Sequence, residues 1–130
     1  MNESAEAVAQ AFVRAINRQD VDEMAGLMTE EHRFIDALEN VAEGRETMVT
    51  AWKSYFNMVP DYTIVVEEIF CDGPIVVLLG TAQGTYAGKG KLVPENRWKT
   101  PIALRAFAEE GKVAEWRVYA DNEPMRRLMR

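Results

Sequence analysis

Hydrophobic residues in the first part of the chain recur at helical spacing. Val8, Phe12 and Ile16 follow one another at four-residue intervals, and this pattern predicts an amphipathic helix near the N-terminus. Asp20 is placed like an N-cap, with Glu23 at the third position of a second, short helix. The chain therefore begins with two predicted helices joined by a brief polar turn.

A third predicted helix has the strongest pattern in the sequence. It follows Gly44 and ends before Pro60, because a residue that precedes a proline is pushed out of the helical region. Its apolar residues recur every three or four positions and are Met48, Trp52, Tyr55, Phe56 and Val59. Between the second and third helices, residues 32–37 are short and mixed in character, and we interpret them as a brief strand.

From residue 61 onward the pattern becomes typical of strands. Branched residues alternate with others, and turn signals such as Asp72-Gly73-Pro74 separate the segments. Four strands are predicted, at 61–71, 75–86, 97–108 and 113–120. Gly80 and Gly84 mark expected bulges or bends in the second of these strands. Helices followed by a meander of strands favour an α+β fold, with the helices packed on one face of an antiparallel sheet.

Composition narrows the class of protein. The 130 residues fit a single domain, residues 1–130, and their net charge of −6 disfavours nucleic-acid binding. The one basic cluster, Arg126, Arg127 and Arg130, is better interpreted as a solvated tail or as charges near a helix C-terminus. Cys71 is the only cysteine, and no apolar run approaches the roughly 20 residues of a membrane span. With no secretion signal at the N-terminus, we expect a cytoplasmic protein that binds neither nucleic acid nor membranes.

Four segments carry a resemblance to a known superfamily. They are residues 11–17 followed by Asp20, then Phe34-Ile35-Asp36, then Gly44-Arg45-Glu46, and finally residues 110–119. Together with the order of elements, they make the chain similar to the nuclear transport factor 2-like superfamily, which includes ketosteroid isomerases, limonene epoxide hydrolase and SnoaL-like polyketide cyclases. The resemblance implies three N-terminal helices packed in a cone against a strongly curved, mainly antiparallel β-sheet. It also implies homodimers formed through the outer face of the sheet.

Asp36 is the leading candidate for catalysis. It lies in the apolar stretch Phe34-Ile35-Asp36-Ala37-Leu38, and apolar surroundings raise the pKa of a carboxyl group, which suits a general base. By the resemblance, Asp36 matches the ketosteroid isomerase base, which moves a proton next to a carbonyl. The alternative is that Asp36 caps a turn or the following helix.

His32, the only histidine, is the second candidate. Alternation along a strand places His32, Phe34 and Asp36 on one face, with His32 and Asp36 roughly 13 Å apart. The two would then line one pocket from opposite ends without bonding to each other. The alternative is a histidine on the surface or at a helix end. A lone histidine is poor evidence for a metal site, so we expect no metal.

Two activities of the superfamily are disfavoured by the residues at their key positions. By the resemblance, Phe12 and approximately Ala103 stand where ketosteroid isomerase has the Tyr and the protonated Asp of its oxyanion hole. Neither side chain donates a hydrogen bond, and one such donor is worth on the order of 10²–10³ in rate. Val118 likewise stands where limonene epoxide hydrolase has a carboxylate, in the run Trp116-Arg117-Val118.

Apolar and aromatic side chains supply the expected pocket wall. The residues expected to line it are Phe12, Phe34, Trp52, Tyr55, Trp116, Val118 and Ala103. At helical spacing, aromatic residues of this kind are also ordinary core residues. Asp121 is a secondary acid–base candidate, and the favoured alternative is that Asp121 or Asn122 caps the short helix at Pro124–Met129. Tyr119 is one of several candidate donors.

Two functions remain open. The first is a cofactor-free isomerase, cyclase or dehydratase that acts on a small apolar carbonyl compound, with Asp36 as base and His32 or a tyrosine as polar helper. The second is a non-catalytic module of the same fold that binds a ligand or forms a dimer. The missing oxyanion donors favour the second, whereas a carboxylate within an apolar wall favours the first.

Overall fold

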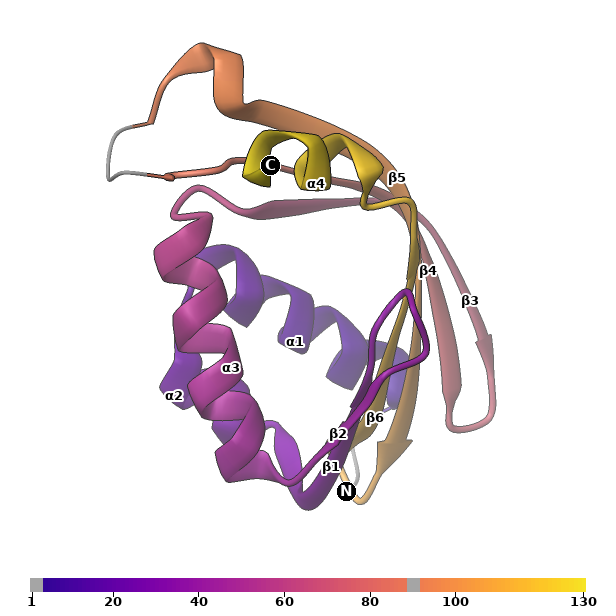
Figure 1. Cartoon of the computed structure of the whole chain (residues 1–130). Coiled ribbons are helices and arrows are strands. Elements are labelled where there is room, and N and C mark those ends of the chain that lie inside the picture. Colours follow the sequence, from indigo (N-terminus) through magenta and orange to yellow (C-terminus); the bar gives the residue numbers. More distant parts are fainter. Residues whose placement is uncertain (1–3, 89–91) are drawn as a thin grey trace.

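The chain wraps a curved sheet around its helices, as the computed structural model of residues 4–88 and 92–130 shows (Figure 1). The helices are α1 (Ala5–Arg18), α2 (Val21–Gly26), α3 (Arg45–Met58) and α4 (Glu123–Met129), with a 3₁₀ turn at Pro94–Asn96. The strands are β1 (Met28–Ile35), β2 (Val41–Glu43), β3 (Thr63–Asp72), β4 (Ile75–Thr85), β5 (Arg97–Glu109) and β6 (Lys112–Ala120). Three helices precede the four long strands, in the predicted order.

The strands of the described residues form one sheet in the order β2-β1-β6-β5-β4-β3. Strands β3, β4 and β5 each pair antiparallel with the next strand in the sequence, as expected of a meander. Strand β1 joins the free side of β6 in the parallel direction, and β2 folds back antiparallel on β1. The predicted α+β fold with a mainly antiparallel sheet is confirmed.

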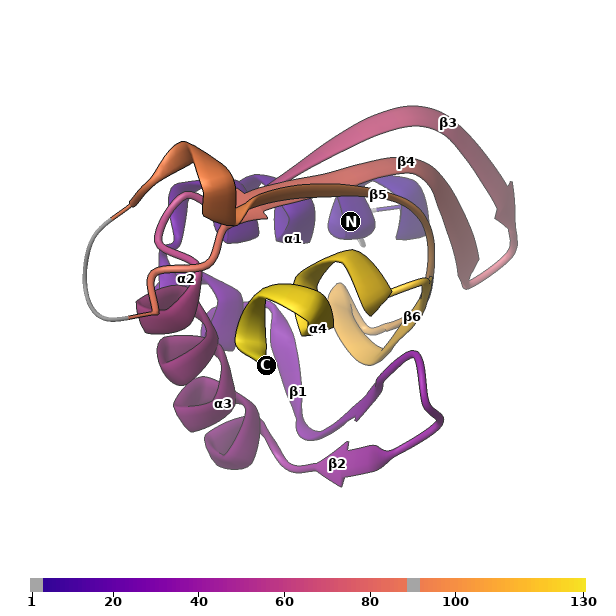
Figure 2. The ribbon, with the colours of Figure 1, turned by 45° about the horizontal axis from the view of Figure 1, so that its top comes forward.

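The sheet curves strongly, so that α1 and α3 lie on its concave side, and α4 lies across one end of the resulting cone (Figures 1 and 2). α1 packs on β3 to β6, while α3 packs on β1, β2 and α2. Gly80 on β4 accommodates a bend, because a Cβ atom there would lie 1.9 Å from the carbonyl oxygen of Val65. The β3–β4 register shifts between Val66 and Glu68, so the bulge beside Gly80 lies in β3, whereas the sequence predicted a bulge or bend in β4.

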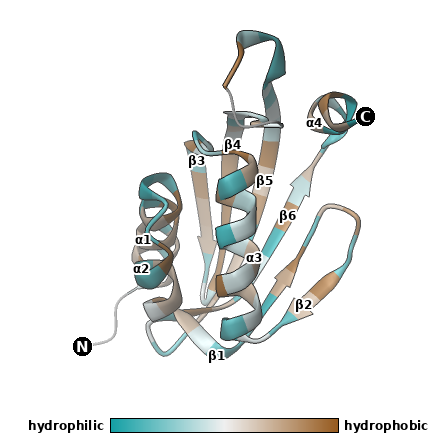
Figure 3. Cartoon of the chain, turned by 60° about the vertical axis from the view of Figure 1, so that its left-hand side comes forward, coloured by the Kyte–Doolittle hydropathy of each residue, from teal (hydrophilic) through white to brown (hydrophobic). Residues whose placement is uncertain are grey.

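An N-cap explains where α2 begins, and an apolar stripe explains how α1 packs. Asp20 Oδ1 accepts a hydrogen bond from Glu23 N at 3.0 Å, so the predicted N-cap of α2 is confirmed. Val8, Phe12 and Ile16 of α1 are fully buried against the sheet, whose central strands β4 and β5 are hydrophobic where the helices cover them (Figure 3). None of the helices in the described residues has both the length and the hydrophobicity needed to cross a membrane.

Asn17, near the end of α1, joins this helix to the edge strand β3. Its Oδ1 accepts a hydrogen bond from Ile64 N at 2.8 Å, and its Nδ2 donates one to Ile64 O at 2.9 Å. The side-chain amide therefore takes the place of a neighbouring strand and satisfies two backbone groups that a sheet edge otherwise leaves open.

The first strand differs from its prediction. It runs from Met28 to Ile35 and ends before Asp36, instead of spanning residues 32–37. Strand β2, which was not predicted, pairs with it from Arg33 to Ile35. Both strands carry charged residues and gain their conformation from pairing with their neighbours in the sheet. Tertiary pairing of this kind overrides weak local strand propensity.

The link between α3 and β3 packs directly on β4. Asp61 Oδ1 accepts a hydrogen bond from Thr85 N, and Asp61 Oδ2 accepts one from Thr85 Oγ1, each at 2.7 Å. Gly84 permits this approach, because a Cβ atom there would lie 2.4 Å from Val59 Cγ1 and 3.4 Å from Tyr62 Cα. Gly84, where the sequence predicts a bulge or bend, is therefore a site of close contact. Strands β4 and β5 pair there without a register shift.

Gly84→Ala should lower the free energy of unfolding by about 1–3 kcal/mol, the usual cost of overpacking a buried site. Val59 is fully buried and branched at Cβ, so the link must shift to make room. Urea unfolding followed by circular dichroism measures the effect. Gly26→Ala is the control, because no atom lies within 4 Å of its Cβ position and alanine favours the helix. A Gly84→Ala midpoint equal to that of the wild type would contradict the prediction.

Candidate functional site

A cavity of about 310 Å³ lies between α3, the end of β1 and β6. The described residues that line it are Phe34, Asp36, Ala37, Met48, Ala51, Trp52, Tyr55, Tyr62, Trp116, Val118 and Asn122. Most of these side chains are apolar or aromatic, and a cavity of this size and character suits a small molecule that contains a ring. Among the described residues, no three His, Cys, Asp or Glu side chains gather into a group that could hold a metal ion.

Helix spacing and strand pairing place the wall residues. Met48, Trp52 and Tyr55 follow one another at intervals of four and three along α3, so they share one face of the helix. Phe34 lies opposite Trp116 in the β1–β6 ladder, and both side chains point toward the concave side of the sheet. Five of the residues predicted to line the pocket are therefore in its wall: Phe34, Trp52, Tyr55, Trp116 and Val118.

A row of aromatic rings runs along the cavity and past one end of it. Successive ring centroids lie 5.0–6.1 Å apart in the order Phe34, Trp52, Tyr55, Tyr62 and Trp98. The contacts from Phe34 to Tyr62 are edge-to-face, an orientation that aromatic pairs favour. Each ring thus holds its neighbour in place, and the first four present apolar surface to the cavity.

Tyr62 is one of two wall residues with a polar side chain that the sequence analysis did not predict, and the other is Asn122. It lies in the link between α3 and β3, where the bonds of Asp61 to Thr85 hold the backbone. Ile64, two residues later, is buried. Extending the alternation of β3 back by two residues would have placed Tyr62 on the same inward side.

Two phenol groups contribute polarity to the wall. Tyr55 Oη donates a weak hydrogen bond to Met125 Sδ at 3.8 Å. Tyr62 Oη makes no hydrogen bond to any residue in the described part of the chain. Burial raises the pKa of both tyrosines well above the ordinary value, and the nearby Tyr62 adds to the effect in Tyr55. Both hydroxyls therefore remain protonated and able to donate.

Asp36 lines the cavity at its rim and is half-buried. Its Oδ1 accepts hydrogen bonds from Leu38 N and Asn40 N, each at 2.9 Å, and its Oδ2 accepts one from Asn40 Nδ2 at 3.0 Å. The carboxylate thus organises the loop between β1 and β2, which is the turn-capping role that the sequence left open. Among the described lining residues it is also the only acid, so its catalytic interpretation stays open.

His32 is fully buried in the core, so the surface alternative was wrong, and it does not line the cavity. Its Nδ1 lies 2.8 Å from Val113 O, which only accepts, so Nδ1 carries the proton and the buried Nε2 has no partner in the described chain. Burial lowers the pKa of the imidazole against smaller opposing effects of Val113 and Glu115. Phe12, predicted to line the pocket, is also in the core, with its ring 6.1 Å from that of His32 and 4.8 Å from that of Trp116.

Ala103 and Tyr119, two further predicted site residues, lie on the outer face of the sheet. They are partners across β5 and β6, and the buried residues of β5 are their neighbours Ile102 and Leu104. Tyr119 is 46% exposed, and the guanidinium of Arg117 lies over its ring at 4.7 Å. Because side chains alternate along a strand, an offset of one residue is enough to assign Ala103 to the wrong face.

Helix α4 lies across the open end of the cone (Figure 2). Asn122, just before this helix, lines the cavity, and Met125 of the helix is buried. Asp121 Oδ1 accepts a hydrogen bond from Glu123 N at 2.9 Å, and Asp121 O accepts one from Thr100 Oγ1 at 2.9 Å. Asp121 therefore anchors the start of α4 and is not among the residues that line the cavity.

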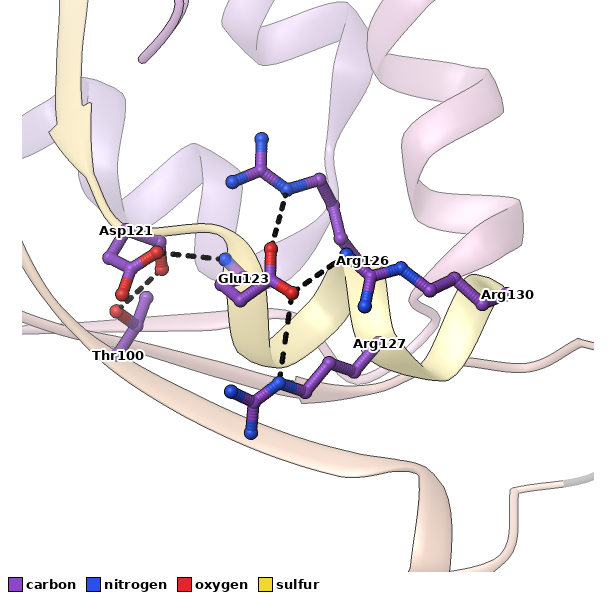
Figure 4. A network of polar contacts seen from close by, with 6 residues as sticks. All are labelled: Thr100, Asp121, Glu123, Arg126, Arg127 and Arg130. Carbon is purple, nitrogen blue, oxygen red and sulfur yellow. Dashed lines mark hydrogen bonds and ion pairs between the residues drawn. The ribbon is translucent and has the colours of Figure 1, made fainter.

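The carboxylate of Glu123 forms ion pairs with three arginines near the C-terminus (Figure 4). Its carboxylate lies 3.3 Å from Arg126 Nε, 3.7 Å from Arg127 Nε and 2.8 Å from an Arg130 guanidinium nitrogen. The cations sit toward the C-terminal end of α4, where the helix dipole favours positive charge. Exposed ion pairs contribute only about 0–1 kcal/mol each, so burial of Met125 is the main attachment of α4 to the fold.

A family model for the SnoaL-like domain matches residues 9–119. The matched span contains every described lining residue of the cavity except Asn122. The chain belongs to the SnoaL-like domain family. Among curated proteins there is no significant match.

Solved structures share this SnoaL-like fold at low sequence identity. A candidate SnoaL-like polyketide cyclase from Shewanella denitrificans OS-217 has a TM-score of 0.84 and 16% identity over 96% of each chain. The candidate polyketide cyclase IdmH from Streptomyces antibioticus has a TM-score of 0.81 and 17% identity, covering 98% of this chain and 99% of its own. AclR, a candidate hydroxylase from Streptomyces galilaeus, has a TM-score of 0.77 and 21% identity over 96% and 95%. These likenesses establish the fold alone.

The free energy of unfolding of this SnoaL-like protein should fall between pH 7.5 and 5.5 because of His32. Burial lowers its folded-state pKa below the roughly 6.5 of an unfolded histidine, so the unfolded chain takes up a proton first as the pH falls. The loss begins near the unfolded pKa, continues down to the folded pKa, and has a slope of at most about 1.4 kcal/mol per pH unit.

Urea unfolding of the wild type and of His32→Gln at several pH values measures this slope. His32 is the only histidine, so the stability of His32→Gln should change less across the same window, whatever its absolute value. Equal slopes in the two proteins would show that His32 does not carry the effect.

Proposed function

We propose that the cavity binds a small, apolar, ring-containing carbonyl compound and catalyses proton transfer on it, with Asp36 as the base. The observation that carries this proposal is a 310 Å³ cavity with a largely aromatic wall and one acidic side chain among its described lining residues. Isomerisation, cyclisation and dehydration of a carbonyl compound can each begin with removal of a proton near the carbonyl. Polyketide cyclases, for which two of the structural neighbours are named, belong to this class.

The loop bonds of Asp36 are compatible with a catalytic role. An ionised carboxylate has about four lone-pair sites, and the loop occupies three of them. The remaining site is available to a ligand in the cavity that Asp36 lines. Because the loop already fixes the carboxylate, little further ordering of the base is needed when a ligand binds.

Ligand binding without turnover is the second candidate function, and the same hydrogen bonds favour it. All three are bonds that a purely structural turn residue makes. In addition, Phe12 lies in the core, where it offers no oxyanion donor. The two candidates share the pocket and differ only in whether Asp36 takes up a proton.

Exchange of the α-protons of 1-tetralone in D₂O tests the catalytic candidate without knowledge of the natural substrate. In this reaction Asp36 removes a proton from the carbon next to the carbonyl, an enolate forms, and a deuteron from the solvent returns to that carbon. The wild type should accelerate the loss of the α-proton signal in NMR spectra. Asp36→Asn should lower the catalysed rate by about 10²-fold or more, because a positioned general base contributes about 10²–10⁴.

Glu39→Gln is the matched control for that experiment. Glu39 is an exposed carboxylate of the same loop, paired with Arg117 at 3.1 Å, and it does not line the cavity. Its removal should leave the exchange rate unchanged. Binding of 1-tetralone without faster exchange would favour the non-catalytic candidate, and unchanged exchange in Asp36→Asn would remove Asp36 as the base.

We also propose that the protein forms a homodimer through the outer face of the sheet. Phe70 and Val77 lie side by side across β3 and β4, and Phe70 is 55% exposed. Leu79, Ala103 and Tyr119 form the next row across β4, β5 and β6. The first row continues through Arg105 and Arg117, so the outer face combines apolar side chains with charged ones. Exposed apolar side chains on adjacent strands, beside polar ones, are typical of an interaction surface.

The wild type should therefore sediment as a dimer, and Phe70→Glu should shift it toward the monomer by burying an unpaired charge in the interface. Analytical ultracentrifugation at micromolar concentrations measures both states. Leu38→Glu is the control, because Leu38 is 66% exposed but lies in the loop between β1 and β2. A wild type that is monomeric across the whole concentration range would contradict the proposed dimer.

A further inference from the structure

The hydroxyl of Tyr62 is a polar group that the packing of the wall does not require. The ring of Tyr62 lies 5.0 Å from that of Tyr55 and 6.0 Å from that of Trp98, measured between centroids. A phenylalanine would make the same ring contacts. The hydroxyl has no hydrogen-bond partner in residues 4–88 and 92–130, and it is not one of the polar atoms that the surrounding protein shields completely. Because Tyr62 lines the cavity, its hydroxyl is left available to a bound group that accepts a hydrogen bond.

The other donors around the cavity are less suited to that task. Tyr55 Oη is directed to Met125 Sδ. The indole nitrogens of Trp52 and Trp98 have no partner among the described residues, but both atoms are shielded by the surrounding protein, and Trp98 does not line the cavity. Among the aromatic donors of the described residues near the cavity, Tyr62 alone combines a place in the wall with a hydroxyl that has no partner in that part of the chain.

We infer that Tyr62 donates a hydrogen bond to the carbonyl oxygen of the ligand and that Tyr55 holds the Tyr62 ring in place by its edge-to-face contact. This inference rests on the proposed function, because it places a carbonyl compound in the same cavity. It names the ligand class as ring compounds with an accepting oxygen, such as cyclic aryl ketones. During proton transfer the same bond stabilises the developing enolate oxygen.

The surroundings of Tyr62 fix the donor before a ligand arrives. Asp61, the preceding residue, binds Thr85 through both carboxylate oxygens at 2.7 Å, and the Tyr62 Cα packs against Gly84. A donor held in this way is preorganised, which is the condition for effective stabilisation of an oxyanion. Burial raises the pKa of Tyr62 well above neutrality, so the group meets the ligand as a neutral phenol.

Binding of 1-tetralone and of tetralin, which lacks the carbonyl oxygen, to the full chain tests the inference. Tyr62→Phe should weaken binding of 1-tetralone about 5- to 10-fold, as expected for one hydrogen bond, and leave binding of tetralin unchanged within about twofold. Titration followed by ligand-detected NMR measures both affinities. Tyr86→Phe, the same change at a tyrosine that lines neither the cavity nor the proposed dimer face, should alter neither.

The outcomes separate this inference from the proposed function. If the wild type binds neither compound, the proposed function fails and the role of Tyr62 fails with it. If both compounds bind and Tyr62→Phe affects them equally, the role of Tyr62 is overturned while the pocket stands. A selective loss in Tyr55→Phe in place of Tyr62→Phe would also overturn it, because the donor would then be Tyr55.

Infrared spectroscopy gives a second readout, and its first measurement uses the wild type alone. The carbonyl stretch of ¹³C-labelled 1-tetralone bound to the wild type should lie at lower frequency than in an apolar solvent, because a donated hydrogen bond weakens the C=O bond. In Tyr62→Phe the band should move back toward the apolar-solvent position. An unshifted band in the wild-type complex would overturn the hydrogen bond from Tyr62.

Discussion

Between α3 and β3 the chain crosses β4 at Gly84, where a Cβ atom would lie 2.4 Å from Val59 Cγ1. Val59 is fully buried at this crossing, and Asp61 fixes it through two 2.7 Å hydrogen bonds to Thr85. Pro60 ends α3, and the contact holds the link that follows the helix against β4. The cavity lies between α3 and the sheet, and Tyr62 of this link lines it. The geometry of the site therefore depends on one position without a side chain.

The row of rings from Phe34 to Trp98 explains how so small a cavity keeps a defined shape. Each ring is held edge-on or tilted against the next at 5.0–6.1 Å, and such pairs contribute about 0.5–1.5 kcal/mol beyond burial of their area. The wall contains few polar side chains, and neighbouring groups hold Asp36 and Tyr62 in place. Asp36 is held by hydrogen bonds within its loop, and Tyr62 by its neighbouring rings. Apolar area would then supply affinity, and the few polar groups would orient the ligand.

Regular periodicity made most of the fold predictable, and irregular backbone limited the rest. The stripe of α3 identified Trp52 and Tyr55, and the meander followed from turn signals and alternation. Strand β2 and the parallel pairing of β1 with β6 were missed, because they depend on contacts between distant segments. Ala103 was assigned to the wrong face by a shift of one residue. Tyr62 lies in the link just before β3, and the alternation that runs back from buried Ile64 indicates its inward direction, although it was not among the residues predicted to line the pocket.

In this SnoaL-like cone, the hydrogen-bond donors lie at other positions than the resemblance to ketosteroid isomerase implies. The α1 position that would carry a donor holds Phe12, which packs with His32 and Trp116 in a dry core. A polar donor there would face apolar rings and a histidine whose Nε2 already has no partner in the described chain. Within the described residues, the cavity-lining phenol that has no protein hydrogen-bond partner belongs to Tyr62, in the link that follows α3. Because one fold supports unrelated chemistries, proteins of this fold can keep the same cone while their polar groups lie at different positions.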